Sequence, residues 1–150
     1  MSSKFFEDVV VGDLFESSGR TICEADFVNF AGVSGDFSPL HSDEEFAKTT
    51  RFKGRIAHGF LTLSVTAGLL SNLPLFNTTV VALLQIMNVK FVNPVRAGDT
   101  IFAQLKIVGK KKSRKKGKGV VSVFISVRNQ ENIEVLTLNY DILVKSKSSR

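Results

Sequence analysis

The stretch 59–73 reads GFLTLSVTAGLLSNL and is followed by Pro74. Wound as a helix, this segment carries apolar residues on nearly every side, which is typical of a helix buried on all faces. Thr, Ser, Gly and Asn residues interrupt it, so it falls short of the roughly 20 apolar residues that cross a membrane. We therefore expect a fully buried helix around which the rest of the chain is wrapped.

The sequence after Pro74 predicts four β-strands. Val80–Phe91 is an almost uninterrupted apolar run, which indicates a central strand covered on both faces. Three further segments alternate between apolar and polar residues, as half-buried strands do. Their apolar faces consist of Ile101, Ala103, Leu105 and Ile107, then Val121, Val123, Ile125 and Val127, then Leu136, Leu138, Tyr140 and Ile142. A fifth strand is indicated within residues 13–22.

Two short helices are predicted before the buried one. Thr21 and Glu24 have the spacing of a capping box, and Ser42 and Glu45 repeat it. Apolar residues at helical spacing follow each pair: Phe27, Phe30 and Ala31 in the first helix, Phe46 and Ala47 in the second. We expect these residues to face inward, with residues 35–41 forming the loop between the two helices.

Composition and element order define the fold class. The chain has 150 residues, 43% of them apolar, and a chain of this size buries roughly 70% of its unfolded surface. Helices followed by strands predict an α+β fold: one domain over residues 1–150, with an antiparallel sheet wrapped around a long buried central helix. Since Cys23 has no second cysteine to bridge and residues 1–8 lack an apolar signal core, we expect a cytoplasmic protein.

The positive charge of the chain is concentrated in one segment. Residues 110–118 carry seven cations, and because the whole chain has a net charge of +6, the remainder sums to −1. The cluster lies between two predicted strands, in a hairpin, and contains no aromatic residue on which a base could stack. We therefore expect no nucleic-acid partner. A nucleic-acid-binding module is the alternative, and it predicts a steep salt dependence of DNA or RNA affinity.

Residues 35–41, GDFSPLH, contain a candidate catalytic pair. Pro39 fixes its own φ and favours extended geometry at Ser38, so the loop is able to hold Asp36 and His41 in one pocket. A carboxylate beside an imidazole binds a water molecule and exchanges protons with it near neutral pH. The structural alternative for this segment is a solvated loop with an Asx-turn.

The segment 54–59, GRIAHG, leads into the predicted buried helix. Gly59 would offer a backbone N–H at the helix N-terminus, where unpaired amides and the helix dipole stabilise negative charge. This position predicts an oxyanion hole. The alternative is that Gly59 only permits close packing between helix and sheet, and that His58 is a structural histidine.

Three blocks of the sequence resemble the MaoC-like, (R)-specific enoyl-CoA hydratases. Residues 30–41, FAGVSGDFSPLH, look like the family's Gly-Asp-x-Asn-Pro-aliphatic-His motif, residues 55–59 look like its second block, and residues 91–95 with 98–100 look like its third. The resemblance covers about residues 11–140. It implies a hot-dog fold and a hydro-lyase that hydrates trans-2-enoyl thioesters or dehydrates (R)-3-hydroxyacyl thioesters of CoA or acyl carrier protein.

The resemblance also implies roles for individual residues. Asp36 and His41 would hold the water that adds to C3, and the Gly59 amide would polarise the thioester carbonyl. Further substrate-binding residues are expected around them: Ser38, Arg55 and His58, with Val33, Phe37 and Phe60 closing an acyl tunnel.

The chain departs from the family pattern at two positions. Ser38 replaces the usual Asn and cannot both donate and accept as an amide does. Ala67 stands where some members have a Ser on the central helix, a role that would fall to Ser64 or Thr66. These departures keep open a second function class, a non-catalytic subunit that binds acyl thioesters. A hot-dog thioesterase is a further alternative, although it leaves the pair of Asp36 and His41 unexplained.

Partners and cofactors follow from this interpretation. We expect an acyl thioester substrate and a homodimer that covers the exposed edges of the sheet, with no metal, redox cofactor or membrane association. The basic hairpin suggests electrostatic attraction to the phosphates of coenzyme A or to an acidic acyl carrier protein. Lys111, Lys112 and Lys115 are the candidate residues for this attraction, and a solvated hairpin tip is the alternative.

Overall fold

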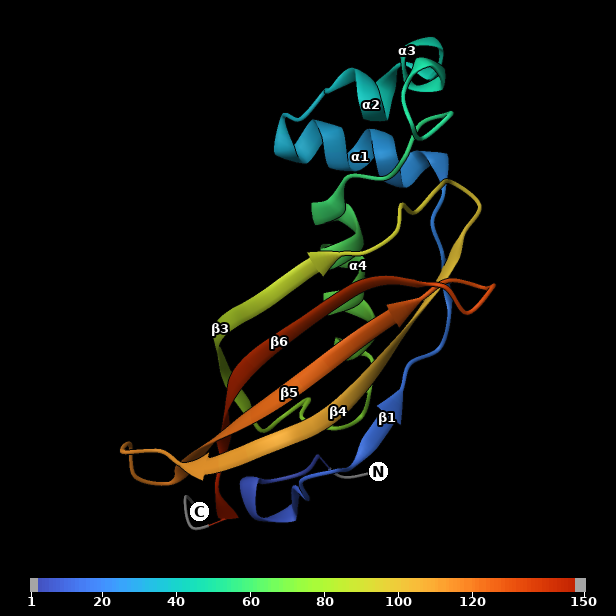
Figure 1. Cartoon of the computed structure of the whole chain (residues 1–150). Helices are drawn as coiled ribbons and strands as arrows, with labels where there is room; N and C mark the ends of the chain where they lie inside the picture. Colours follow the sequence, from blue (N-terminus) through green and yellow to red (C-terminus); the bar gives the residue numbers. More distant parts are fainter. Residues whose placement is uncertain (1–2, 148–150) are drawn as a thin grey trace.

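The computed structural model describes residues 3–147, which form one antiparallel sheet and five helical segments (Figure 1). The helical segments are η1 (Phe6–Asp8), α1 (Glu24–Ser34), α2 (Pro39–Ser42), α3 (Glu44–Thr49) and α4 (Gly59–Ser71). The strands are β1 (Leu14–Glu16), β2 (Arg20–Thr21), β3 (Val80–Phe91), β4 (Thr100–Lys112), β5 (Lys118–Arg128) and β6 (Glu134–Lys145).

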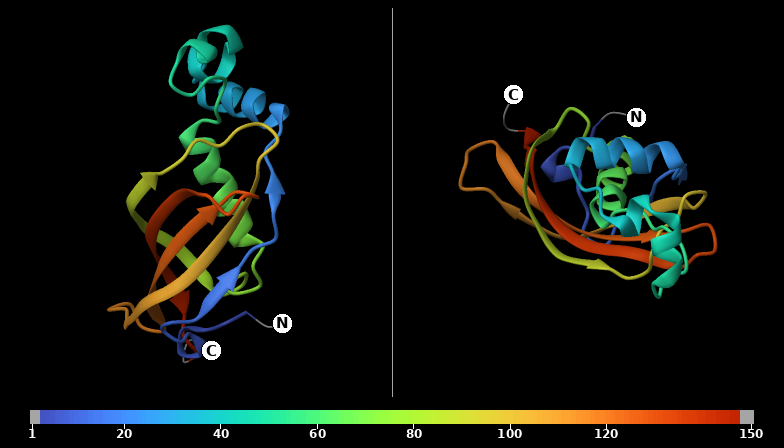
Figure 2. Two further views of the ribbon diagram at one scale, coloured as in Figure 1. Left: turned by 45° about the vertical axis from the view of Figure 1, so that its right-hand side comes forward. Right: turned by 90° about the horizontal axis from the view of Figure 1, so that it is seen from above.

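The sheet curls around α4 and leaves the short helices at one end. Its strand order is β1-β4-β5-β6-β3, and β2 also pairs with β4. Figure 2 shows the sheet curving along one side of α4, while α1, α2 and α3 gather beyond the N-terminus of α4. The long strands thus form a trough for the central helix, and the helical segments before α4 form a cap over one end of that trough.

Alternation along the long strands produces the core, as predicted. The inward faces of β4 and β5, which begin at Ile101 and Val121, are at most 2% exposed, and Leu136 and Leu138 of β6 are equally buried. Tyr140 follows on the same face of β6, where burial raises the pKa of its hydroxyl to about 12. The fifth strand is confirmed as β1 and β2, separated at Ser17, whose N–H donates to the Ala103 carbonyl and whose Oγ accepts the Ala103 N–H.

The prediction that α4 is buried on all faces is wrong. The helix ends at Ser71, and one stripe of it is exposed: Phe60, Ser64, Ala67, Gly68 and Ser71. These positions lie on one side of a 3.6-residue helix, and Phe60 is 68% exposed. The reason is that a single curled sheet covers only part of the helix circumference, so an apolar helix in this chain retains an uncovered face.

The prediction that Val80–Phe91 is a central strand is also wrong. This segment is β3, which within residues 3–147 pairs with β6 alone and so forms an edge of the sheet. Its apolar residues remain open to solvent on both faces, with Leu83 56% and Leu84 49% exposed. A continuous apolar run therefore indicates that both faces of a strand are suited to burial. It does not specify whether the same chain or another one covers them.

The helix starts differ from the predicted capping boxes. Cys23, not Thr21, precedes α1, and Asp26 takes the place predicted for Glu24 by accepting the Cys23 N–H. Asp43, not Ser42, caps α3 by accepting the N–H of Phe46. Ala47 is buried as predicted, whereas Phe46 is 47% exposed. The predicted loop at residues 35–41 also ends in the short helix α2, which carries His41.

Gly119 of β5 allows a close approach that a side chain would prevent. A Cβ at this position would lie 2.1 Å from the ring of Phe6, a core residue that is 8% exposed. We predict that Gly119→Ala lowers the free energy of unfolding by about 1–3 kcal/mol, because the ring must move out of a packed core. Gly109→Ala is the matched control, since its Cβ would only touch Ser122 at 3.7 Å. Urea denaturation of both variants measures the difference, and equal stabilities would contradict the prediction.

No helix within residues 3–147 is long and apolar enough to cross a membrane.

Candidate active site

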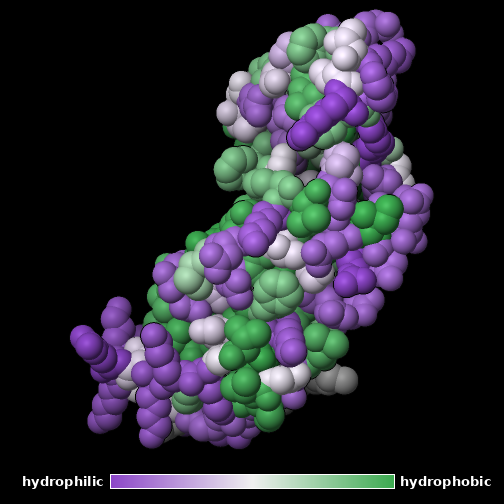
Figure 3. Space-filling model, in the orientation of Figure 1, coloured by the Kyte–Doolittle hydropathy of each residue, from purple (hydrophilic) through white to green (hydrophobic). Residues whose placement is uncertain are grey.

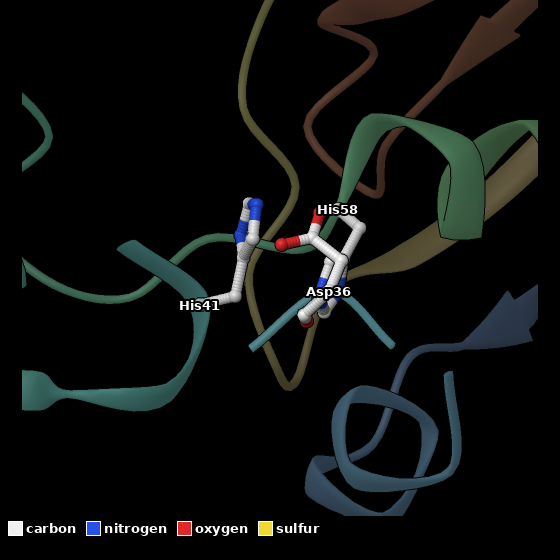
Figure 4. Close-up of side chains that lie close together, drawn as sticks. All are labelled: Asp36, His41 and His58. Carbon is white, nitrogen blue, oxygen red and sulfur yellow. The ribbon is translucent and has the colours of Figure 1, made fainter. Parts of the chain in front are cut away.

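Three titratable side chains meet where the cap of short helices joins α4 (Figure 4). Asp36 lies between α1 and α2, His41 lies on α2, and His58 directly precedes α4. One ligand atom of each side chain lies within 4.8 Å of the others. The structure thus brings together both residues of the predicted catalytic pair and adds His58 to them.

Local backbone geometry presents the Asp36 carboxylate. Gly35 ends α1 in the left-handed conformation, at φ 74°, which favours glycine and turns the chain sharply. The Asp36 N–H then donates to the Ser34 hydroxyl, and its Oδ1 accepts the Ser38 N–H at 3.1 Å. This second bond is made by the main chain, so it does not require the Asn that the family pattern has in place of Ser38.

A backbone carbonyl determines which nitrogen of His41 carries a proton. Nδ1 lies 2.8 Å from the carbonyl oxygen of Ile56, and a carbonyl only accepts hydrogen bonds, so Nδ1 carries the hydrogen. In the neutral ring, Nε2 then has a free lone pair. His41 is therefore oriented with Nε2 as its acceptor nitrogen.

His58 is held in the same manner and is buried. Its Nε2 lies 2.9 Å from the main-chain carbonyl of Asp36, to which it donates, and the residue is 2% exposed. Its Nδ1 is buried without a hydrogen-bond partner among the described residues. The ring lies 3.9 Å from that of His41, centroid to centroid, and 5.0 Å from that of Phe30. His58 thus contacts both members of the predicted catalytic pair. It bonds the main-chain carbonyl of Asp36, and its ring lies against the ring of His41.

Two histidines and an aspartate are also residue types that hold metal ions. The rings of His41 and His58 are tilted by 33° relative to each other, and one ligand atom of each lies within 4.8 Å of the other and of the Asp36 carboxylate. One nitrogen of each ring already bonds a main-chain carbonyl. The other nitrogen of each ring and the Asp36 carboxylate are left as ligand atoms for an ion or as hydrogen-bond partners for a small polar molecule.

Gly59 begins α4 beside the end of β3. A Cβ on this residue would lie 3.0–3.1 Å from the ring of Phe91, so the packing is close, as the structural alternative proposed. Gly59 is nevertheless the first residue of the helix after His58, and the first N–H groups of a helix have no partner within it. Close packing and an available amide therefore occur together at this position.

Arg55 is occupied by ion pairs. Its guanidinium lies 2.9 Å from Glu24 of α1 and 3.1 Å from Glu44 of α3. The main-chain N–H of Arg55 also donates to Glu44, and this bond is the largest cause of the lowered pKa of that carboxyl. Arg55 thus ties two helices of the cap to the segment before α4, and its contact with substrate stays a prediction.

Sequence reasoning missed Arg96 entirely. The guanidinium of Arg96 donates to the carbonyl oxygens of Arg55 and Phe52. The Val95 carbonyl next to it accepts the Ala57 N–H. Residues 95–96 thus fix the path of the chain that delivers His58. A lone arginine in a loop carries no local sequence signal for contacts with a segment about 40 residues earlier.

The predicted tunnel residues do not line the main cavity. Val33, Phe37 and Phe60 are 88%, 64% and 68% exposed. A cavity of about 610 Å³ lies instead between α4, the sheet and the segment that links α4 to β3. The lining is mainly apolar: Leu63, Ser64, Thr66, Ala67, Leu70, Ser71, Leu73, Leu75, Phe76, Asn77, Val80, Leu83, Ile86, Leu105, Leu138, Tyr140 and Ile142. Helical spacing in the sequence could have predicted this side of the cavity, because Gly59, Leu63, Thr66 and Leu70 share one face of α4.

The two hydroxyls considered in place of a serine at Ala67 are both engaged by the helix. Ser64 Oγ donates to the Phe60 carbonyl at 2.7 Å, and Thr66 Oγ1 donates to the Thr62 carbonyl at 2.8 Å. All three side chains line the cavity. The two hydroxyl groups in the cavity wall therefore already donate to backbone carbonyls of α4.

Lys111, Lys112 and Lys115 lie far from these residues. They belong to the end of β4 and the turn that follows, at the opposite end of the sheet from the cap (Figure 1). The structure thus separates them from Asp36 and His41 of the same chain.

His58 provides a prediction about positioning. His58→Phe retains a ring beside His41 but removes the donor to the Asp36 carbonyl, so we expect kcat to fall about 10–100-fold, as misplaced catalytic groups do. His58→Gln retains an amide donor and is expected to recover part of the loss. Steady-state kinetics on an enoyl thioester, with thermal unfolding to verify folding, measure both effects. A loss confined to KM, or no loss for the Phe variant, would contradict this role.

Comparisons with known proteins agree with the geometry. The family model described as "MaoC like domain" matches residues 8–129. An (R)-specific enoyl-CoA hydratase from Rhodospirillum rubrum is 41% identical over 106 residues, which cover 70% of each chain. The solved structure of a monoamine oxidase regulatory protein from Archaeoglobus fulgidus is 36% identical, with a TM-score of 0.91 over 98% of this chain and 97% of that one.

The chain therefore belongs to the MaoC-like family and has its α+β hot-dog fold. It is also 38% identical, over 75% of its length, to Protein MaoC from Klebsiella aerogenes, but it spans only 32% of that longer protein. Hydratase and dehydratase chemistry is the activity that the names of its relatives support in general.

Proposed function

We propose that this protein adds water to trans-2-enoyl thioesters to form (R)-3-hydroxyacyl thioesters, or catalyses the reverse dehydration. The observation that carries the proposal is that Asp36 and His41 present a carboxylate oxygen and Nε2 to one small volume, while Asp36 Oδ1 and His41 Nδ1 are held by main-chain bonds.

The pair is suited to bind and activate one water molecule. A water has two O–H donors, and the Asp36 carboxylate and His41 Nε2 are two acceptors. The water oxygen forms the bond to C3, one of its protons passes to the pair, and the pair delivers a proton to C2. The net change is addition of H₂O across the double bond, and the same groups serve the dehydration in reverse.

Gly59 supplies the second element of the proposal. As water adds to C3, negative charge develops on the thioester oxygen, and an N–H at the start of α4 stabilises it. Because this donor belongs to the helix backbone, it needs no reorganisation during the reaction. We assign the carbonyl of the substrate to this amide, beside the catalytic pair.

The acyl chain is assigned to the cavity. Leu63, Thr66 and Leu70 line the cavity and share one helical face with Gly59. From Gly59 to Ser71 the helix rises about 18 Å at 1.5 Å per residue, so a chain that starts at the Gly59 amide runs along α4 into apolar surroundings. A thioester with an extended acyl group fits this arrangement.

The proposal includes the wider setting of the protein. The apolar edge strand β3 and the uncovered stripe of α4 suit a homodimer, which would cover both. The exposed free thiol of Cys23 suits a reducing cytoplasmic setting. The chemistry assigned to Asp36, His41 and Gly59 requires no metal or redox cofactor.

The test is hydration of crotonyl-CoA, followed by loss of the ultraviolet absorbance of the conjugated thioester, with the chirality of the product determined. An (R)-3-hydroxy product supports the proposal. Tight binding without turnover, on both CoA and carrier-protein thioesters of several lengths, would show instead a non-catalytic binding subunit. Release of free thiol, detected with Ellman's reagent, would show a thioesterase.

A further inference from the structure

The basic hairpin presents a set of unpaired cations. Lys110 folds back, and its Nζ donates to the carbonyl oxygens of Phe6 and Val9. The other cations are Lys111, Lys112, Arg114, Lys115, Lys116 and Lys118, and no carboxylate within residues 3–147 forms an ion pair with any of them. Figure 3 shows this end of the molecule as separate hydrophilic side chains that project into solvent. We refer to these six residues as the basic tip.

The basic tip cannot serve the catalytic pair of its own chain. β4 has 13 residues, which at about 3.3 Å per residue span roughly 40 Å. The strand starts at the end that carries α1, α2 and α3, and the basic tip lies at its other end (Figure 1). A partner attracted by the tip is therefore delivered away from Asp36 and His41 of the same chain.

The edge strand β3 indicates where a second copy binds. It is a 12-residue strand with an unpaired edge, and Val80, Val81, Leu83, Leu84 and Ile86 are 41–56% exposed on it. A long apolar edge of this kind pairs with another strand. Two copies that join their β3 strands antiparallel extend the sheet and close the cavity that opens beside Val80, Leu83 and Ile86. Such a pairing has twofold symmetry, with the axis perpendicular to the sheet.

The twofold axis reverses the direction of the partner's strands. The end of the sheet that carries the basic tip in one copy is thus the end that carries Asp36, His41 and Gly59 in the other. We propose that the basic tip of each subunit docks the acidic carrier protein whose thioester is processed in the active site of the partner subunit. The inference rests on the proposed function and names the carrier and its route of entry.

The shape of the tip favours a protein over a nucleotide. Figure 3 shows this end of the molecule as separate protruding hydrophilic side chains, and no aromatic residue lies between positions 110 and 118 to stack on an adenine ring. Point charges spread over a protruding surface match the distributed carboxylates of an acidic protein. A small protein domain is about 30 Å across, so it is able to contact the tip while its thioester arm enters the neighbouring site.

The first experiment compares two variants that lose the same charge. Lys115→Gln with Lys116→Gln removes two cations of the tip, and Lys48→Gln with Lys106→Gln removes two exposed cations outside it. At low ionic strength we expect kcat/KM for an enoyl carrier-protein thioester to fall at least about 5-fold for the tip variant and less than about 2-fold for the control, because steering depends on local charge. Added salt is expected to erase the difference. Equal effects of the two variants would overturn the proposal.

The second experiment asks which subunit's tip serves which site. Differently tagged subunits are combined into mixed dimers, in which one subunit carries His41→Gln and so has no active site. In the first mixed dimer, Lys115→Gln and Lys116→Gln are placed in the subunit with the intact site. The tip that serves this site belongs to the other subunit and is unchanged, so we expect kcat/KM close to that of a mixed dimer without tip substitutions. In the second mixed dimer, both substitutions are placed in the His41→Gln subunit, whose tip serves the intact site. We then expect kcat/KM to fall at least about 5-fold. The opposite pattern, or a monomer by sedimentation under assay conditions, would overturn the proposal.

Two further outcomes separate this inference from the proposed function. A fall in turnover of crotonyl-CoA equal to that with the carrier-protein thioester would mean that the tip binds nucleotide phosphates, and the carrier-protein assignment would be wrong. If the wild-type chain turns over neither thioester, the proposed function fails by itself. Direct binding of acylated carrier protein to the wild type and to the tip variant then tests the docking surface, and equal affinities would refute it.

Discussion

Asp36→Asn and His41→Gln are each expected to lower kcat/KM for an enoyl thioester by at least about 10²-fold, the range that general acid–base groups contribute. Asn retains the size of Asp36 and an oxygen able to accept the Ser38 N–H, so the loop keeps its turn while the carboxylate charge is lost. Gln at position 41 retains a polar side chain but has no nitrogen that takes up a proton. Both variants therefore remove proton transfer with little change in volume.

A neighbouring substitution serves as the control. Asp43→Asn makes the same chemical change seven residues after Asp36, where the side chain caps α3, and Asn is as good an N-cap as Asp. We expect its kcat/KM to remain within about 3-fold of wild type, because the residue has no part in proton transfer. Initial rates at one pH, with substrate below KM, measure all three variants. Wild-type rates for either Asp36→Asn or His41→Gln would exclude that residue from the chemical step.

Gly59→Pro is expected to lower kcat by about 10²–10³-fold, the cost of removing one oxyanion donor. Proline has no N–H and is favoured at the first position of a helix, which is where Gly59 lies. His58 before it has ψ 137°, the extended geometry that precedes proline without strain. The substitution therefore removes the amide hydrogen with little expected disturbance of α4.

Gly59→Ala separates the loss of the amide from added bulk. Its Cβ would lie 3.0 Å from the ring of Phe91, and Phe91 is 52% exposed at the end of β3, so the ring has room to shift. We expect a kcat within about 10-fold of wild type for this variant, because the donor is retained. Single-turnover kinetics of both variants, with circular dichroism to verify folding, provide the comparison. If Ala and Pro are equally damaging, packing against Phe91 is the cause, and the oxyanion role of Gly59 is wrong.

Patterns along the chain were sufficient to predict the antiparallel sheet and the central helix, and the resemblance of residues 30–41 to a family motif singled out Asp36 and His41, which the structure brings together. Strand alternation reports which face of a strand is apolar, and that information is local in the sequence. The position of β3 in the sheet was not predictable in the same way. Its apolar residues lie at the surface of the single chain, and a sequence does not distinguish burial by its own chain from burial by another.

The parts of the site that the sequence did not predict depend on contacts between distant segments. Arg55 has the chemistry of a thioester-binding residue, yet Glu24 and Glu44 engage it in the folded chain. The cavity lies along α4 and β3 rather than at Val33, Phe37 and Phe60. Both features have one cause, since residue type and local spacing do not specify which neighbour the fold brings into contact.

The carbonyls of Ile56 and Asp36, which bond the two imidazoles, show that main-chain atoms fix the hydrogen positions of the candidate site. These carbonyls determine which ring nitrogens hold hydrogen, and they do so whatever side chain is attached at position 56. An alanine scan would therefore pass over Ile56 as ordinary hydrophobic packing. Replacing the amide between Ile56 and Ala57 with an ester would weaken this carbonyl as an acceptor without altering a side chain, but it would also remove the Ala57 N–H that donates to Val95. Replacing Ala57 by its N-methyl form, which loses the same N–H and keeps the amide carbonyl, is therefore the control.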